Sequence, residues 1–356
     1  MPKEPISKLK AFVPSWPSVI MGTGALTIAL SLSSKVIPAL SYLASVFLII
    51  TTAMTVYILA TWLLRIIHHP KQLWIDLKHP VTGSFIPTMP ISLMILALAI
   101  LQVGPNLIGE NLSYKSAYTL FWIGTVGIYI FSWIIIPLLF QNETVSYDHG
   151  TFGWYIPPVS HLIIPVLGFD LLHITHNGDH VSIIMAISLI SLGIGTILFL
   201  LVGPNIFHRY LYNSSPKGKM APTIMIGLAP TAILAIIVVK IIALTGLNPE
   251  STISSLSLAL WIGVPLWGFS IWWLVLSTIK IITTLVKDKP HFSLSWWAIT
   301  FPLGTVSIST GALNKLLKLA ALDSVLAGLT ITLLSIWIIV TVLTIKGLKN
   351  LTIFED

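Results

Sequence analysis

Histidine and aspartate side chains gather in one short stretch of the sequence, at residues 170–180. It contains Asp170, His173, His176, Asp179 and His180, and imidazole and carboxylate groups at such spacing can bind a divalent metal ion. His173, His176 and His180 are therefore candidate metal ligands. A polar, solvent-exposed loop explains the same composition more simply, so we predict neither a bound metal nor any other cofactor.

Another histidine, His161, lies in the middle of a long apolar segment. An ionisable side chain at membrane depth is by default a candidate functional residue, here as a proton relay. A histidine that is held by a hydrogen bond and only packs between helices fits the sequence equally well.

Residues for covalent or acid–base catalysis are missing from the apolar part of the chain. The sequence has no cysteine, which excludes thiolate catalysis, disulfides and iron–sulfur clusters. Ten long stretches between charged side chains, such as 149–169 and 220–239, carry no Asp or Glu, so a membrane hydrolase would lack its carboxylates. A membrane haem subunit needs paired histidines, and only His161 lies deep in a stretch. We predict that the protein is not an enzyme.

The elements that carry these residues are ten predicted transmembrane helices. Hydrophobic side chains make up 55% of the 356 residues and charged side chains only 9%, whereas a soluble domain carries about 25% charged residues. A bilayer core of about 30 Å needs roughly 20 residues of helix. The sequence therefore predicts one all-α transmembrane domain in a lipid bilayer, residues 1–356, with spans near 14–33, 38–64, 84–104, 116–140, 156–174, 181–204, 221–244, 255–280, 295–313 and 324–345.

The basic residues lie between these apolar spans, where they act as topology signals rather than as nucleic-acid contacts. With the N-terminus in the cytoplasm, 14 Lys and Arg residues lie on inner segments and five on outer ones. The outer five are Lys35, Lys115, Lys240, Lys315 and Lys318. We therefore expect a multi-pass protein of the cell membrane with both termini in the cytoplasm and no nucleic-acid partner.

Prolines distinguish the odd-numbered spans from the even-numbered ones. The odd spans begin near residues 14, 85, 156, 221 and 296, an interval of about 70 residues that predicts five repeated helical hairpins. A proline inside a helix frees a carbonyl, which is tolerated where the helix faces protein or a water-filled cavity. The odd helices are therefore expected to form an inner ring around a central pore, although prolines that merely begin helices would give a similar pattern. The predicted kinks lie at Pro17, Pro90, Pro165, Pro230 and Pro302.

Small and hydroxyl side chains accompany these prolines. Small residues leave space and hydroxyls can donate hydrogen bonds to an anion, but both also serve close helix packing in membranes. No Lys or Arg lies in the middle of an odd span, so selectivity would come from neutral donors and helix dipoles, which suits weakly hydrated monovalent anions. The candidate pore-lining residues are Gly22, Thr23, Gly24, Ser84, Phe85, Thr88, Ser160, Thr223, Thr231, Thr300, Gly304 and Thr305.

Three segments resemble the tellurite-resistance/dicarboxylate transporter family. They are FVPSWPSVIMGTG at residues 12–24, HPVTGSF at residues 79–85 and SWWAITFP at residues 295–302. That family includes bacterial TehA, the plant slow anion channels, and malate and sulfite transporters. The resemblance implies a fivefold barrel of hairpins, an assembly of three identical chains, and a pore closed by the phenylalanine before the ninth-helix proline, which is Phe301 in this sequence.

Together, the residues and the resemblance predict an anion channel or uniporter for small anions of the chloride or nitrate type. A proton-coupled carrier of C4-dicarboxylates such as malate, or of sulfite, is the alternative within the same family. In that case His161 is the candidate relay.

Overall fold

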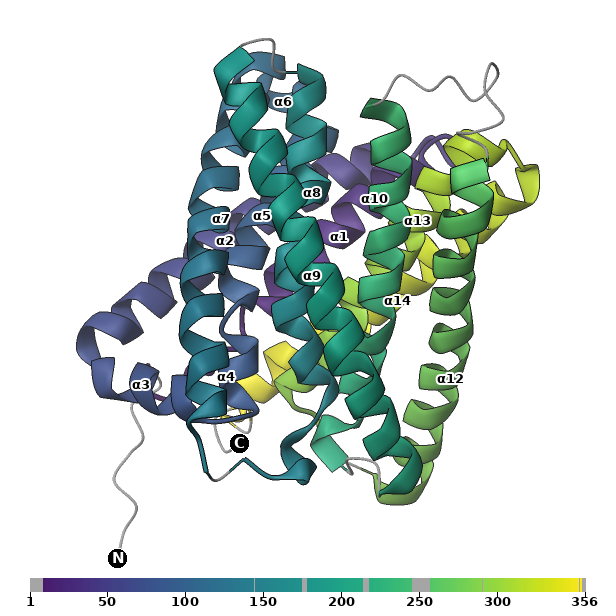
Figure 1. Ribbon diagram of the computed structural model, residues 1–356. Coiled ribbons are helices and arrows are strands. Elements are labelled where there is room, and N and C mark those ends of the chain that lie inside the picture. The colour runs from purple at the N-terminus through teal and green to yellow at the C-terminus, as the bar shows by residue number, and fades with distance from the viewer. Residues whose placement is uncertain are drawn as a thin grey trace, which may run out of the picture.

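The computed structural model describes residues 9–143, 145–174, 178–213, 218–244, 257–289, 291–351 and 353. All regular structure in these residues is helical, as predicted, and Figure 1 shows a bundle of long helices. Eight helical segments are long and apolar enough to cross a membrane. They are Leu40–His68, Thr82–Val103, Glu110–Phe140, Phe152–Ile174, His180–Tyr212, Met220–Leu244, Ala259–Asp288 and Ala320–Lys349.

Two further helices fall on the first and ninth predicted spans. Helix α1, Ser18–Ser33, has 16 residues and is apolar, and helix α13, Thr300–Leu317, has 18 residues. The other long helices are α2 (Leu40–His68), α5 (Thr88–Val103), α7 (Glu110–Phe140), α8 (Ile156–Ile174), α9 (Gly178–Tyr212), α10 (Ala229–Leu244), α12 (Val264–Asp288) and α14 (Ala320–Lys349).

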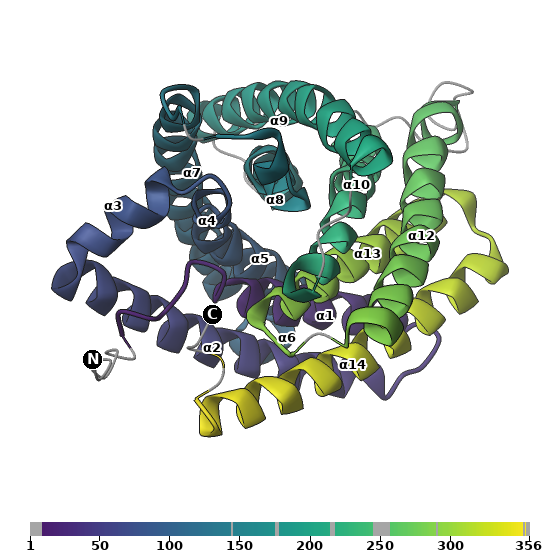
Figure 2. The same ribbon diagram turned by 90° about the horizontal axis from the view of Figure 1, so that it is seen from below.

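The long helices divide into buried and peripheral ones. The apolar 18-residue stretches within the segments that contain α5, α8 and α10 are 83%, 89% and 78% buried, whereas those within the five peripheral segments are 22–33% buried. Helices α1 and α13 are also buried along most of their length. The peripheral helices α2, α7, α9, α12 and α14 each contact the buried helix that precedes them along the chain. Figure 2 shows this for α9, which lies outside α8.

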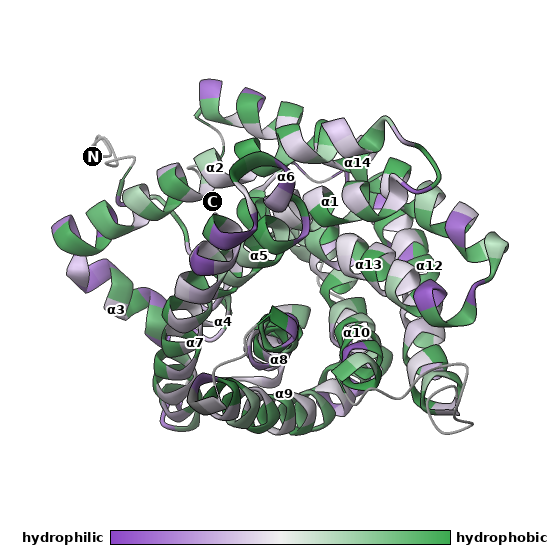
Figure 3. Ribbon diagram, turned by 90° about the horizontal axis from the view of Figure 1, so that it is seen from above, coloured by the Kyte–Doolittle hydropathy of each residue, from purple (hydrophilic) through white to green (hydrophobic). Residues whose placement is uncertain are grey.

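The peripheral surface is apolar. Large hydrophobic side chains such as Trp133 and Phe140 on α7 and Leu201 on α9 are 70%, 86% and 61% exposed. Figure 3 shows the hydrophobic character most clearly along α9. Protein surfaces that face water rarely expose so much apolar area, so these faces fit contact with lipid.

The buried helices begin after short segments of tighter or irregular backbone. Helices α8, α10 and α13 follow 3₁₀ segments at Phe152–Tyr155, Gly218–Leu228 and Leu294–Ile299, and α5 follows the single turn α4, Thr82–Phe85. The prolines lie at these junctions. Pro17 precedes α1, and Pro90, Pro230 and Pro302 lie in the first turns of α5, α10 and α13. Pro165 alone among the five predicted kinks lies in a helix interior, in α8.

Small residues allow the buried helices to approach one another closely. A Cβ atom on Gly304 of α13 would lie 2.5 Å from the Cβ of Ala25 on α1, and one on Gly24 would lie 2.6 Å from Ile95 Cγ2 on α5. Both distances are far below van der Waals contact. A residue larger than glycine would therefore push these helices apart, as close packing in membranes predicts.

A buried ion pair fastens the segment after α2. Arg65 of α2 contacts Asp76 of the short helix α3, Pro70–Lys78, with 2.7 Å between Nη2 and Oδ2, and the side chains are 3% and 9% exposed. Arg65 Nε also donates to the carbonyl oxygen of Lys10, and Ile353 packs in one cluster with Phe12. The first and last described residues therefore lie at the same end of the bundle.

Candidate functional site

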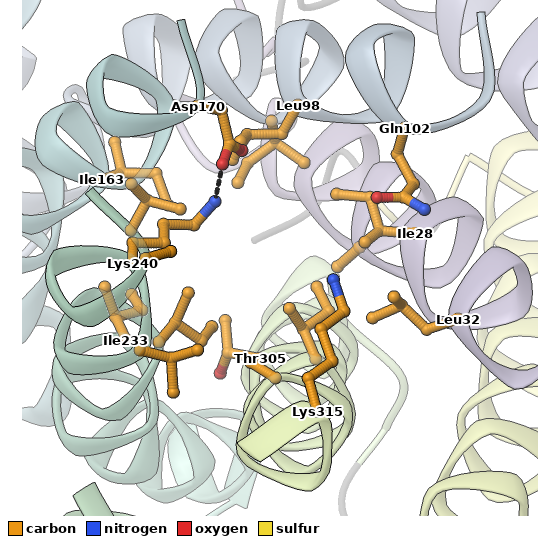
Figure 4. A pocket seen from close by; sticks show the side chains of 18 of the residues that line it. Ile28, Leu32, Leu98, Gln102, Ile163, Asp170, Ile233, Lys240, Thr305 and Lys315 are labelled. Carbon is orange, nitrogen blue, oxygen red and sulfur yellow. Dashed lines mark hydrogen bonds and ion pairs between the residues drawn. The ribbon is translucent and has the colours of Figure 1, made fainter. Parts of the chain in front are cut away.

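A cavity of about 280 Å³, called the outer cavity below, lies among the five buried helices, and all five contribute to its wall. Each helix contributes residues at successive positions i, i+3 and i+7, which lie along one face of a helix. The wall is mainly aliphatic, and Figure 4 shows the aliphatic and charged side chains that surround the open space. Three levels of wall residues follow along the helices, starting from the end next to Phe301: Ala25, Ile95, Ile163, Ile233 and Thr305; then Ile28, Leu98, Val166, Ile236 and Ile308; then Leu32, Gln102, Asp170, Lys240 and Ala312.

The ionisable residues of this cavity all lie at the end away from Phe301. Asp170 and His173 come from α8, Lys240 from α10 and Lys315 from α13. Lys240 Nζ forms an ion pair with Asp170 Oδ1, and the two side chains are 19% and 33% exposed. Figure 4 shows Lys240 and Lys315 extending into the space from different helices. This end is called the mouth of the cavity below.

A second, smaller pocket of about 40 Å³, called the inner pocket below, lies at the opposite ends of the same helices. Its wall includes the first residue of each of four buried helices, namely Ser18, Thr88, Ile156 and Ala229, and Phe301 in the first turn of α13. None of the described residues that line it carries a charge. The five helices therefore run in parallel from this pocket toward the mouth. The positive ends of their dipoles, about half an elementary charge each, are directed to the uncharged pocket.

Phe301 belongs to the walls of both spaces, and no other residue is shared by the two sets of lining residues that the structure describes. Its side chain is 5% exposed. Met21, Val159 and Ala229 of other buried helices line the small pocket with it. The phenyl ring thus lies between the outer cavity and the inner pocket.

The structure distributes the predicted lining residues between the cavities and the helix contacts. Phe85 and Thr88 line the inner pocket and Thr305 lines the outer cavity. The other candidates line neither of these two spaces. The hydroxyl groups of four of them donate a hydrogen bond to a backbone carbonyl three residues earlier, namely those of Ser84, Ser160, Thr223 and Thr300. Thr23 accepts a hydrogen bond from Trp337, and Thr231 forms one with Ser270. The three glycines, Gly22, Gly24 and Gly304, lie at helix crossings.

The deep histidine faces away from both spaces. His161 Nε2 lies 3.0 Å from Ser132 Oγ on the peripheral helix α7, and the imidazole packs edge-on against Tyr129. Its Nδ1 is buried and has no hydrogen-bond partner among the described residues. The contacts are therefore those of a packing residue between α7 and α8.

The other candidate ligands do not come together within the described residues. No group of three His, Asp or Glu side chains there could hold a metal ion. His173 lies at the mouth, His180 Nδ1 is hydrogen-bonded to Tyr118 at 2.9 Å, and His176 lies outside the described residues.

The Asp170–Lys240 pair and Lys315 are the functional candidates that sequence reasoning missed. A usable signal was present, since Asp170 and Lys240 are 70 residues apart, which is the proline interval. The same interval links Leu32, Gln102, Asp170, Lys240 and Ala312 at spacings of 70, 68, 70 and 72 residues.

A core of buried, parallel helices inside an apolar shell, with two separate spaces that share one phenylalanine in their walls, defines a polytopic membrane protein of the transport class. The sequence model of the SLAC1 family, described as a voltage-dependent anion channel, matches residues 11–345 of this chain. The chain therefore belongs to this family, which confirms the predicted resemblance.

Curated relatives cover nearly the whole chain. Two uncharacterized transporters of Methanocaldococcus jannaschii are each 29% identical over 98% of this chain, and the alignments cover 98% and 96% of those proteins. The sulfite efflux pump SSU1 of Arthroderma otae is 23% identical over 94% of this chain and 90% of its own length.

Proposed function

We propose that the chain conducts small monovalent anions through a pore that runs along the five buried helices, and that Phe301 closes this pore. In this proposal ten helices, in five hairpins, cross the membrane, and the buried helices form the inner ring. The observation that carries it is the position of Phe301, which lines both the outer cavity and the inner pocket.

The electrostatics of the two spaces favour anions over cations. The inner pocket combines uncharged walls with the positive ends of five helix dipoles, which stabilise a negative charge. The outer mouth carries two ammonium groups and one carboxylate among its described residues. An aliphatic wall between them offers little hydration, so strongly hydrated anions pay the larger desolvation cost.

A gate of this kind is physically accessible. A phenyl ring across a narrow apolar passage excludes water, and a desolvated anion then meets a barrier of several kcal/mol at least. Turning the ring by about 30° from a rotamer minimum costs only about 0.5–1.5 kcal/mol. Pro302 removes one backbone donor beside the ring and restricts the conformation of Phe301, so the backbone helps to set the ring direction.

The test is anion flux into liposomes that contain purified protein. Phe301→Ala is expected to raise chloride and nitrate flux at least severalfold, with nitrate preferred to chloride and chloride to sulfate. The matched control is Phe269→Ala on the peripheral helix α12, where the ring is 42% exposed. Flux that is equal in the well-folded Phe301→Ala variant and the parent would refute the gate.

Sulfite transport is the second candidate, because three curated relatives that cover most of the chain are sulfite efflux pumps. Flux of sulfite with and without an imposed pH gradient separates the two proposals. Sulfite uptake that depends on the gradient and exceeds nitrate uptake would favour a coupled carrier.

The proposed orientation places both termini in the cytoplasm and the cavity mouth outside. The described chain ends lie together, and Arg65, Lys71 and Lys78 lie near them, in agreement with the excess of basic residues expected at the cytoplasmic face. By the resemblance, we further propose that three chains assemble, each with its own pore.

A further inference from the structure

Among the residues that the structure describes, the mouth of the outer cavity contains one ammonium group in an ion pair and one outside any ion pair. Asp170 neutralises Lys240 through their ion pair. Lys315 forms no ion pair with any residue that the structure describes. Its side chain is exposed to the cavity opening and extends into the space, as Figure 4 shows.

Lys315 also connects the cavity to the outer surface. A neighbouring groove of about 450 Å³ shares Leu32 and Lys315 with the cavity and contains Lys35 and Lys318 as further basic residues. The acidic residue of this groove, Asp323, already accepts a hydrogen bond from Asn314 Nδ2 at 2.7 Å. An anion that approaches along the groove therefore meets the Lys315 ammonium where the groove and the cavity join.

We propose that the mouth is an anion-binding site whose donor is Lys315, and that the Lys240–Asp170 ion pair makes this site prefer monovalent over divalent anions. The proposal rests on the proposed function, since it concerns the entrance of the same pore. A single free ammonium balances one negative charge. A second charge on the bound anion finds Lys240 already neutralised and the Asp170 carboxylate repelling it.

Replacing Asp170 by asparagine tests this arrangement without changing the size of the side chain. The substitution removes the carboxylate charge and releases Lys240, so that two ammonium groups face one cavity. A divalent anion can then be balanced by both ammonium groups, whereas a monovalent anion gains only a more positive electrostatic potential at the mouth. The matched control is Glu110→Gln, the same charge change at an exposed residue that lies outside the cavity lining.

A chemical probe reads the mouth without relying on transport. The chain has no cysteine, so Ala312→Cys, one turn below Lys315 on the same cavity wall, gives a single reactive thiol. The readout is the reaction rate with anionic sulfonatoethyl methanethiosulfonate divided by the rate with cationic trimethylammonioethyl methanethiosulfonate. Lys315→Gln is expected to lower this ratio about three- to tenfold at low salt and less at high salt, since nearby exposed charges are screened. Lys315→Arg should preserve it.

Anion competition completes the test at constant ionic strength. In the parent, nitrate and chloride should slow the anionic reagent more than sulfate does at equal anion concentration. In Asp170→Asn, sulfate should become the stronger competitor, and the sulfate-to-chloride flux ratio should rise severalfold, whereas Glu110→Gln should change neither.

The outcomes separate this inference from the proposed function. A rate ratio unchanged by Lys315→Gln would overturn the binding site, and an Asp170→Asn variant that behaves like Glu110→Gln would overturn the role of the ion pair, even with normal anion flux. If instead the probe responds as expected while the parent carries no anion flux, the mouth site stands and the channel proposal fails.

Discussion

The contact between Gly304 and Ala25 predicts the cost of adding one methyl group where helices α13 and α1 cross. A Cβ at position 304 would lie 2.5 Å from the Ala25 Cβ, against about 3.5–4.0 Å for a relaxed contact between carbon atoms. Helices α13 and α1 would have to separate by about 1 Å or more. Overpacking of this kind costs about 1–3 kcal/mol, and the higher helix propensity of alanine returns up to about 1 kcal/mol. Gly304→Ala should therefore lower the free energy of unfolding by about 1–2 kcal/mol.

The assay is reversible unfolding in detergent micelles, followed by tryptophan fluorescence, on a double-mutant cycle. Ala25→Gly removes the atom that the new methyl group meets, so Gly304→Ala should be neutral or slightly stabilising in that background. The matched control is Gly193→Ala on α9, where an added Cβ meets nothing within 4 Å. If Gly304→Ala is as mild as Gly193→Ala, or if Ala25→Gly gives no rescue, the close crossing of α1 and α13 is wrong.

The remaining predictions concern topology, the deep histidine and the buried ion pair. Single cysteines at Glu110 and at Asp148, whose side chain is 85% exposed, should react with impermeant reagents from opposite sides of the membrane; labelling of both from one side would refute the topology. His161→Gln should cost about 1 kcal/mol of stability and leave the flux and its pH dependence intact, since the imidazole contacts Ser132 rather than the cavities, whereas loss of pH-dependent flux would support a relay. Asp76→Asn should destabilise by about 3–5 kcal/mol because it leaves the buried charge of Arg65 unpaired, and a melting temperature equal to that of the parent would contradict this.

The all-helical class could be predicted from the sequence, and the five hairpins that the spacing of the prolines predicts stay a prediction. The bilayer demands long apolar helices, and prolines recur every 70 residues or so at the junctions where the buried helices begin. Phe301 is singled out by the family resemblance of residues 295–302 together with its position before Pro302.

The lining residues could not be predicted from hydroxyl groups. In a buried helix a serine or threonine satisfies itself on a carbonyl three or four residues earlier, as Ser160 does on Pro157 at 2.6 Å and Thr223 on Met220 at 2.7 Å. The hydrogen bond of such a hydroxyl group is made within its own chain segment, so the hydroxyl group does not indicate a position that faces a pore. The face that each helix turns toward the cavity is set by its packing against its neighbours, and this is a tertiary property that leaves only an i, i+3, i+7 pattern within uniformly apolar sequence.

In the proposed repeat, a single ring would be enough to close the proposed passage. Three positions that the interval of about 70 residues relates to Phe301, namely Met21, Val159 and Ala229, line the inner pocket, and none of the three is aromatic. Five phenylalanines at one level would overfill the bundle, whereas one large side chain among smaller ones can block the passage and still turn aside. Symmetry is broken a second time at the mouth, where Asp170, Lys240 and Ala312 occupy equivalent positions with different charges. The two departures lie on opposite sides of an aliphatic wall. We therefore expect the rate of conduction and the choice of anion to respond to separate substitutions, at Phe301 for the rate and at the mouth for the charge of the anion.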